Sequence, residues 1–123
     1  MRFCIDAHAL LWNLEDSKRL SNSAKETIDA AESIYIPTIV LLEVHSILEK
    51  RKEEGKFIDF LDKLLNQSKF TVYPLSIEVI KEFVKIERNE MHDRIVIATA
   101  KLLSLPIITK DENMTNIYPK VIW

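Results

Sequence analysis

Short apolar runs alternate with longer amphipathic stretches along this chain. Four of the runs, at residues 2–5, 34–36, 70–73 and 106–109, are apolar or rich in β-branched and aromatic side chains, which is typical of buried strands. Residues 121–123 can add an edge strand. The pattern predicts an α/β fold, a three-layer α/β/α sandwich in which helices cover both faces of a small, mostly parallel sheet.

Helices are expected in the intervals between these strands. Ser21 or Ser23, Thr38 and Ser76 each precede an apolar helical pattern, so they are expected to cap it. Gly55 lies where the helix that begins at Thr38 should end. The helix after Ser76 is expected to turn the side chains of Ile77, Ile80 and Val84 inward, with Phe83 as a further candidate. The expected helices cover residues 9–12, 24–31, 38–52, 57–65, 77–84 and 93–103.

Composition narrows the classes of function. The 123 residues are 47% hydrophobic and 29% charged and contain no repeat or linker, so a single domain over residues 1–123 is expected. Lys+Arg 17 against Asp+Glu 19 gives a net charge of −2, so there is no global basic field that would indicate a nucleic-acid partner. One glycine excludes a phosphate-binding glycine loop, and one cysteine excludes a disulfide framework or a cysteine zinc site.

No segment predicts a membrane protein. No apolar run approaches the roughly 20 residues of a membrane span. The chain also turns polar at Asp6, before the apolar core of a signal peptide could form. The expected location is therefore the cytoplasm.

Four acidic residues stand at positions where carboxylates call for an explanation. Asp6 and Asp111 follow predicted strands, and the carboxyl ends of parallel strands meet at one edge of a sheet. Each of the two could alternatively be a turn residue or a helix cap. Glu43 and Asp93 share their helix faces with apolar residues, where a carboxylate needs a cation or hydrogen-bond donors. An arginine partner for Glu43 and a capping role for Asp93 are the alternatives.

A shared pocket for these four carboxylates would be unfavourable without a cation. Gathered carboxylates repel and raise one another's pKa values, and Mg²⁺ or Mn²⁺ relieves this conflict because both ions take oxygen ligands. Such metals activate water and stabilise the leaving oxygen of a phosphodiester. The pattern predicts a metal-dependent phosphodiesterase whose catalytic residues and metal ligands are Asp6, Glu43, Asp93 and Asp111.

The motifs around these acids resemble those of PIN-domain ribonucleases. Residues 5–12 (IDAHALLW) resemble the opening motif, and residues 42–44 (LEV) resemble the second acid on its helix. Residues 93–100 (DRIVIATA) are similar to the third motif and residues 108–111 (ITKD) to the closing Thr-x-Asp. The resemblance covers essentially the whole chain and is nearest to VapC-like toxins of type II toxin–antitoxin systems. It implies a PIN-like fold, Mg²⁺- or Mn²⁺-dependent endoribonuclease activity, a homodimer and inhibition by a cognate antitoxin protein.

Three further residues are expected to contact RNA or to support the acids. The closing motif implies that Thr109 supplies a supporting hydroxyl, and His8 could contact a substrate phosphate or a metal-bound water. Arg94, next to Asp93, is the candidate for a contact with the RNA backbone. The alternatives are a solvent-facing or capping role for His8 and a surface ion pair for Arg94. The basic run at residues 50–52 is expected to be an ordinary solvated face.

Two other functions fit parts of this pattern. Asp6 could be the nucleophile of a phosphohydrolase of haloacid-dehalogenase type, although His8 replaces the second aspartate of that motif and the chain has no room for the cap domain. A non-catalytic PIN-like module that binds other proteins would keep the fold without the activity. The intact set of four acids favours the endoribonuclease.

Overall fold

A five-stranded sheet forms the centre of the computed structural model, which describes all residues from 1 to 123. Its order is β3-β2-β1-β4-β5, and every neighbouring pair is parallel. The strands are β1 (Arg2–Ile5), β2 (Ser33–Pro37), β3 (Phe70–Tyr73), β4 (Ile107–Ile108) and β5 (Val121–Ile122). The predicted parallel sheet is confirmed, and β4 is shorter than the predicted run at 106–109.

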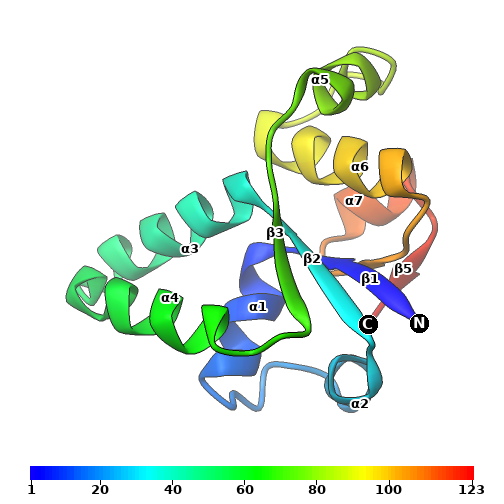
Figure 1. Ribbon diagram of the computed structural model, residues 1–123. Helices are drawn as coiled ribbons and strands as arrows, with labels where there is room; N and C mark the ends of the chain where they lie inside the picture. The colour runs from blue at the N-terminus through cyan, green and yellow to red at the C-terminus, as the bar shows by residue number, and fades with distance from the viewer.

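Helices pack on both sides of this sheet. They are α1 (Ala7–Leu14), α2 (Asn22–Ala30), α3 (Thr38–Lys50), the 3₁₀ turn η1 (Glu54–Lys56), α4 (Phe57–Leu65), α5 (Ile77–Phe83), α6 (Met91–Leu103) and α7 (Glu112–Ile117). In Figure 1, α1, α3 and α4 lie to the left of the sheet, and α5, α6 and α7 lie to its upper right. The three-layer prediction is therefore confirmed. None of the helices has the length and apolarity that a membrane crossing requires.

The core is built on the two central strands. Ile5, Ile107 and Ile108 are fully buried because helices cover both faces of β1 and β4. Cys4 is buried among them, and this burial raises the pKa of its thiol to about 12. The thiol is therefore a small apolar core group and takes no part in chemistry at neutral pH.

Two of the three predicted serine and threonine caps are confirmed. Ser21 and Ser76 accept backbone N–H bonds at the starts of α2 and α5. Thr38 is not a cap, because its hydroxyl donates to the carbonyl of Tyr73 and so ties α3 to the end of β3. The end of α3 also differs from the prediction: the helix stops at Lys50, and the left-handed residue beyond it is Lys52, with φ of 59°, and not Gly55.

The inward face of α5 is not the predicted one. Ile77, Ile80 and Val84 are exposed, Val79 is the buried residue of this helix, and Phe83 alone of the predicted residues packs, partly buried, against the core. The segment IEVIKEF carries apolar side chains on two faces, so its periodicity alone could not decide which face meets the core. This leaves an apolar face of α5 uncovered.

Candidate active site

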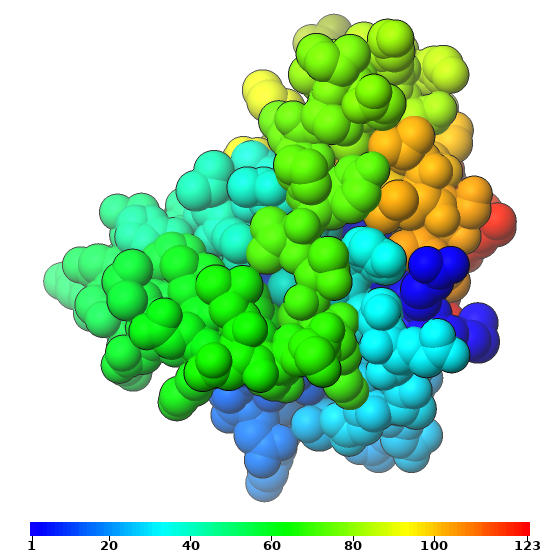
Figure 2. All heavy atoms as spheres, in the orientation of Figure 1, coloured from blue at the N-terminus to red at the C-terminus, as the bar shows by residue number.

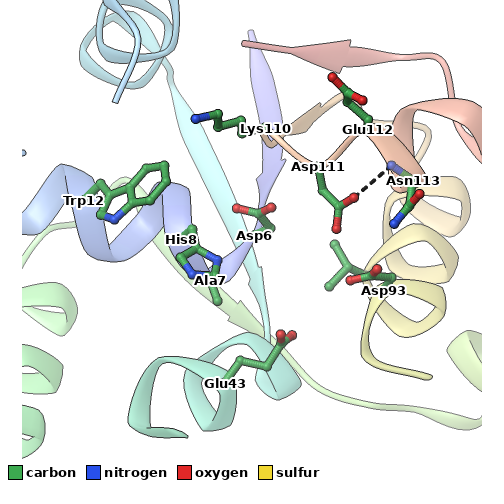
Figure 3. A pocket seen from close by; sticks show the side chains of 11 residues that line it. Asp6, Ala7, His8, Trp12, Glu43, Asp93, Lys110, Asp111, Glu112 and Asn113 are labelled. Carbon is green, nitrogen blue, oxygen red and sulfur yellow. Dashed lines mark hydrogen bonds between the residues drawn. The ribbon is translucent and has the colours of Figure 1, made fainter. Parts of the chain in front are cut away.

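The four predicted acids meet at one cavity at the carboxyl ends of β1 and β4. The cavity has a volume of about 570 Å³, and its lining includes Asp6, Glu43, Asp93 and Asp111. Figure 3 shows these four carboxylates coming from four separate parts of the fold and pointing into the same space. The juxtaposition expected from the ends of parallel strands is therefore present in the structure.

Asp6 is fixed on both of its oxygens. It follows β1 and caps α1, where Oδ1 accepts the backbone N–H of Ala9 at 3.1 Å. Oδ2 accepts a hydrogen bond from the hydroxyl of Thr109, at the end of β4. The first acid is therefore held rigidly at the floor of the pocket.

Thr109 connects this acid to the next. It is almost fully buried, and its Oγ1 accepts the backbone N–H of Asp111 at 3.0 Å while donating to Asp6. Asp111 caps α7, accepting the N–H of Asn113 at 2.8 Å. Thr109 thus forms hydrogen bonds to two of the acidic residues of the pocket, Asp6 and Asp111.

Glu43 on α3 and Asp93 on α6 reach the pocket from the helices on either side. Neither forms an ion pair, so the arginine partner considered for Glu43 is absent. The capping alternative for Asp93 is wrong, since Glu90 caps α6 by accepting the N–H groups of His92 and Asp93, both at 3.0 Å. The Asp93 carboxylate is therefore free to face the pocket.

Burial and mutual repulsion make this pocket electrostatically unfavourable. Burial raises the pKa of Asp6 to about 6, and the nearby charge of Asp111 adds to the rise. Burial raises the pKa of Glu43 to about 7, with Asp93 as the next cause, and burial together with Asp111 raises the pKa of Asp93 to about 7. The acids act on one another's charge, as carboxylates do in a shared low-dielectric site.

The donor set fits a hard divalent cation that keeps part of its water shell. Four carboxylates face the pocket, and no ion pair neutralises any of them. No three of them already surround a single point closely enough to enclose an ion. Mg²⁺ is commonly held by one or two carboxylates and several waters, so the open spacing suits Mg²⁺ or Mn²⁺ better than an ion that needs a closed cage of protein ligands.

The other two predicted site residues lie in different surroundings. His8 lines the pocket beside Asp6, and burial is the main cause that lowers its pKa. Arg94 does not line the pocket: its Nη2 donates to the carbonyls of Phe83 and Ile86 at 3.1 Å, and its guanidinium lies 4.0 Å from the centre of the Phe83 ring. The predicted contact between Arg94 and RNA is therefore not supported, because its head group fastens α5 to α6.

Some residues of the pocket were not anticipated from the sequence. Lys110 and Glu112 line it from the segment that follows β4, and Trp12 closes it on the side of α1. Lys110 and Glu112 flank Asp111 in sequence, so adjacency to a predicted acid was the available signal. Trp12 is largely buried and also belongs to the hydrophobic core.

These features place the protein in a class, the three-layer α/β/α domains with an acidic pocket at the carboxyl edge of a parallel sheet. The sequence matches the PIN domain family over residues 3–119. The chain therefore belongs to the PIN domain family. No protein of curated function matches it significantly in sequence.

Solved structures agree with this assignment at the level of the fold. A toxin–antitoxin complex from Klebsiella pneumoniae is similar over 98% of this chain and 96% of its own, with TM-score 0.70 and 22% identity. VapBC2 from Rickettsia felis, bound to a promoter DNA fragment, covers 98% and 96% with TM-score 0.74 and 15% identity. VapC20 from Mycobacterium tuberculosis, described as a Sarcin-Ricin loop cleaving toxin, covers 93% of each chain with TM-score 0.71 and 15% identity. The expected PIN-like fold is confirmed.

Proposed function

We propose that this protein is a metal-dependent endoribonuclease and the toxin of a toxin–antitoxin pair. The observation that carries the proposal is the gathering of four carboxylates around one pocket, none of them in an ion pair, because such a site can bind the divalent metal that promotes hydrolysis of a phosphodiester. The similar structures support the finer assignment: one is described as a toxin that cleaves the Sarcin-Ricin loop, and others are toxin–antitoxin complexes. RNA is the proposed substrate and a cognate antitoxin protein the proposed partner.

In this proposal each pocket residue has a defined role. Asp6, Glu43, Asp93 and Asp111 would hold Mg²⁺ or Mn²⁺, which supplies a nucleophilic water and charge stabilisation when bound. Thr109 keeps Asp6 in one orientation through its hydroxyl.

The geometry disfavours the alternative of an aspartate nucleophile. Both oxygens of Asp6 accept hydrogen bonds, from Ala9 and Thr109, and this reduces their nucleophilicity. The same two hydrogen bonds suit a metal ligand, because they hold the Asp6 carboxylate in one orientation. Turnover of small phosphomonoesters through a covalent aspartyl-phosphate would reverse this assignment.

Purified protein is expected to cleave RNA with Mg²⁺ or Mn²⁺ and to lose this activity in EDTA. The reason is that the four carboxylates repel the anionic phosphodiester unless a bound cation offsets their charge. Gel analysis of total RNA, with and without added metal after chelation, measures the effect. Cleavage that persists in EDTA would refute the metal-dependent mechanism, and the absence of cleavage in every metal would favour the non-catalytic module.

The expected homodimer has a candidate surface on α5. The exposed apolar side chains around this helix are Leu75, Ile77, Ile80, Val84 and Met91. Figure 2 shows the segment around α5 standing out at the top of the molecule. A patch of this kind suits a two-fold interface, where the same surface meets itself.

Ile80→Glu is expected to convert a dimer into a monomer, because it places a charge in the centre of that apolar face. Ile58→Glu, at an exposed isoleucine on α4, is the control and should leave the dimer unchanged. Sedimentation velocity distinguishes the two states. A monomeric wild type, or an Ile80→Glu variant that stays dimeric, would exclude α5 as the interface.

A further inference from the structure

A second cavity adjoins the acidic pocket and extends along α3. It has a volume of about 420 Å³ and shares His8 and Glu43 with the first. Beyond these shared residues its lining includes Ser46 and Lys50. In Figure 3, α3 carries Glu43 at the lower edge of the pocket, below His8. The two cavities therefore form one continuous groove, acidic at one end and open to a lysine at the other.

The helix repeat explains this gradient along the groove. Glu43, Ser46 and Lys50 are spaced by three and four residues, so their side chains follow one face of α3. Seven residues of α-helix separate Glu43 from Lys50 by about 10 Å along the axis. An RNA strand whose scissile phosphodiester lies at the four acids would thus place a neighbouring phosphate near the hydroxyl of Ser46 and the ammonium of Lys50.

Lys50 is available for such a contact, unlike several other cations of the chain. It forms no ion pair, whereas Arg51 beside it contacts Glu15 at 2.8 Å and Lys56 contacts Glu53 at 3.2 Å. The basic run at 50–52, expected to be a solvated face, is therefore divided: Arg51 ties α3 to the end of α1, and Lys50 faces the groove.

Lys50 is the one lysine or arginine in the lining of this second cavity. With a net charge of −2 and an acidic pocket, the protein needs local cations to hold a polyanion next to the acids.

We propose that Lys50, assisted by Ser46, forms a subsite for an RNA phosphate adjacent to the scissile one. The proposal rests on the endoribonuclease function and names the part of the surface that holds the substrate strand. The ammonium would form a salt-dependent contact with the phosphate, and the Ser46 hydroxyl would donate one hydrogen bond to it. Exposed Leu42, also on this cavity, offers an apolar surface to the attached nucleoside.

Steady-state cleavage of a defined RNA substrate by Lys50→Ala tests the subsite. We expect KM to rise about tenfold with kcat within about twofold of wild type, because the contact is made equally in the ground and transition states. The dependence of log(kcat/KM) on log[salt] should become shallower by about 0.7, the loss of one phosphate contact on a single strand. Lys50→Arg should keep KM close to the wild-type value, and Ser46→Ala should raise KM to a smaller extent than Lys50→Ala does.

Lys101→Ala is the matched control. Lys101 is an exposed lysine in the last turn of α6, as Lys50 is in the last turn of α3, and both helices have 13 residues. Both variants lose one positive charge and one favourable contact with a helix dipole. Equal kinetics for the two variants, whether both impaired or both normal, would overturn the subsite. If wild type cleaves RNA and Lys50→Ala matches it, only the subsite is rejected; if wild type cleaves no RNA, the nuclease function is rejected with it.

Discussion

Asp93→Asn is expected to lower kcat for RNA cleavage by about 10³-fold, the scale of removing a group that acts in the transition state. Asp6→Asn should have an effect of similar size, since Asp6 is the acid held by Thr109 at the floor of the pocket. Both substitutions keep the shape of the side chain and remove its charge. Initial rates at saturating RNA and Mn²⁺ measure the loss.

Asp93→Asn should not lose stability. Burial and Asp111 raise the pKa of Asp93 to about 7, so the charged form is unfavourable in the folded state, and an amide relieves this. After allowance for solvent screening, a gain of about 1 kcal/mol in the free energy of unfolding is expected at pH 7.5 without metal. Asp59→Asn, at an exposed position on α4, controls for the change in net charge and should leave kcat unchanged. Full activity in Asp93→Asn would refute the assignment of the site.

Without metal, the protein is expected to become less stable as the pH rises from about 4 to about 7. The pKa values of Asp6, Glu43 and Asp93 are all raised in the folded chain, to about 6, 7 and 7. In this window the folded state binds more protons than the unfolded state, so the free energy of unfolding falls with increasing pH. Thermal unfolding in EDTA at several pH values measures the slope, and Asp93→Asn should reduce it.

With divalent metal bound, the protein should become more stable, and not less, as the pH rises toward neutrality. At neutral pH a concentration of Mn²⁺ 100 times its Kd adds about 2.7 kcal/mol to the free energy of unfolding. For a domain of this size that corresponds to a rise of about 10 °C in Tm. The rise should be small at pH 4.5, where the ligands are protonated, and small in Asp93→Asn at any pH. A Tm that is unchanged by Mn²⁺ at pH 7.5 would show that the pocket is not a metal site.

Most of the scaffold could be predicted because its signals are local. The apolar runs of β1 and β3 coincide with the observed strands, and Ser21 and Ser76 cap helices through their own side chains. The candidate acids could be identified for a related reason. A carboxylate at the end of a strand or within an apolar helix face conflicts with its surroundings, and this conflict is visible in the sequence.

What escaped prediction depends on contacts between distant elements. The outward turn of Ile80 is decided by the packing of α5 on α6, and Arg94 is drawn to the carbonyls of Phe83 and Ile86. The division of the basic run at 50–52 depends on Glu15, at the end of α1. None of these partners can be read from the neighbouring sequence, since each comes from another part of the chain.

The hydrogen bond between Asp6 and Thr109 joins residues 103 positions apart. During synthesis the amino-terminal part of a chain leaves the ribosome first, at about 5–20 residues per second. A nascent chain that carries Asp6, Glu43 and Asp93 still lacks β4, which brings in Thr109 and Asp111 beside β1. A growing polypeptide therefore cannot assemble the pocket until the segment that carries Thr109 and Asp111 has been made and has paired with β1.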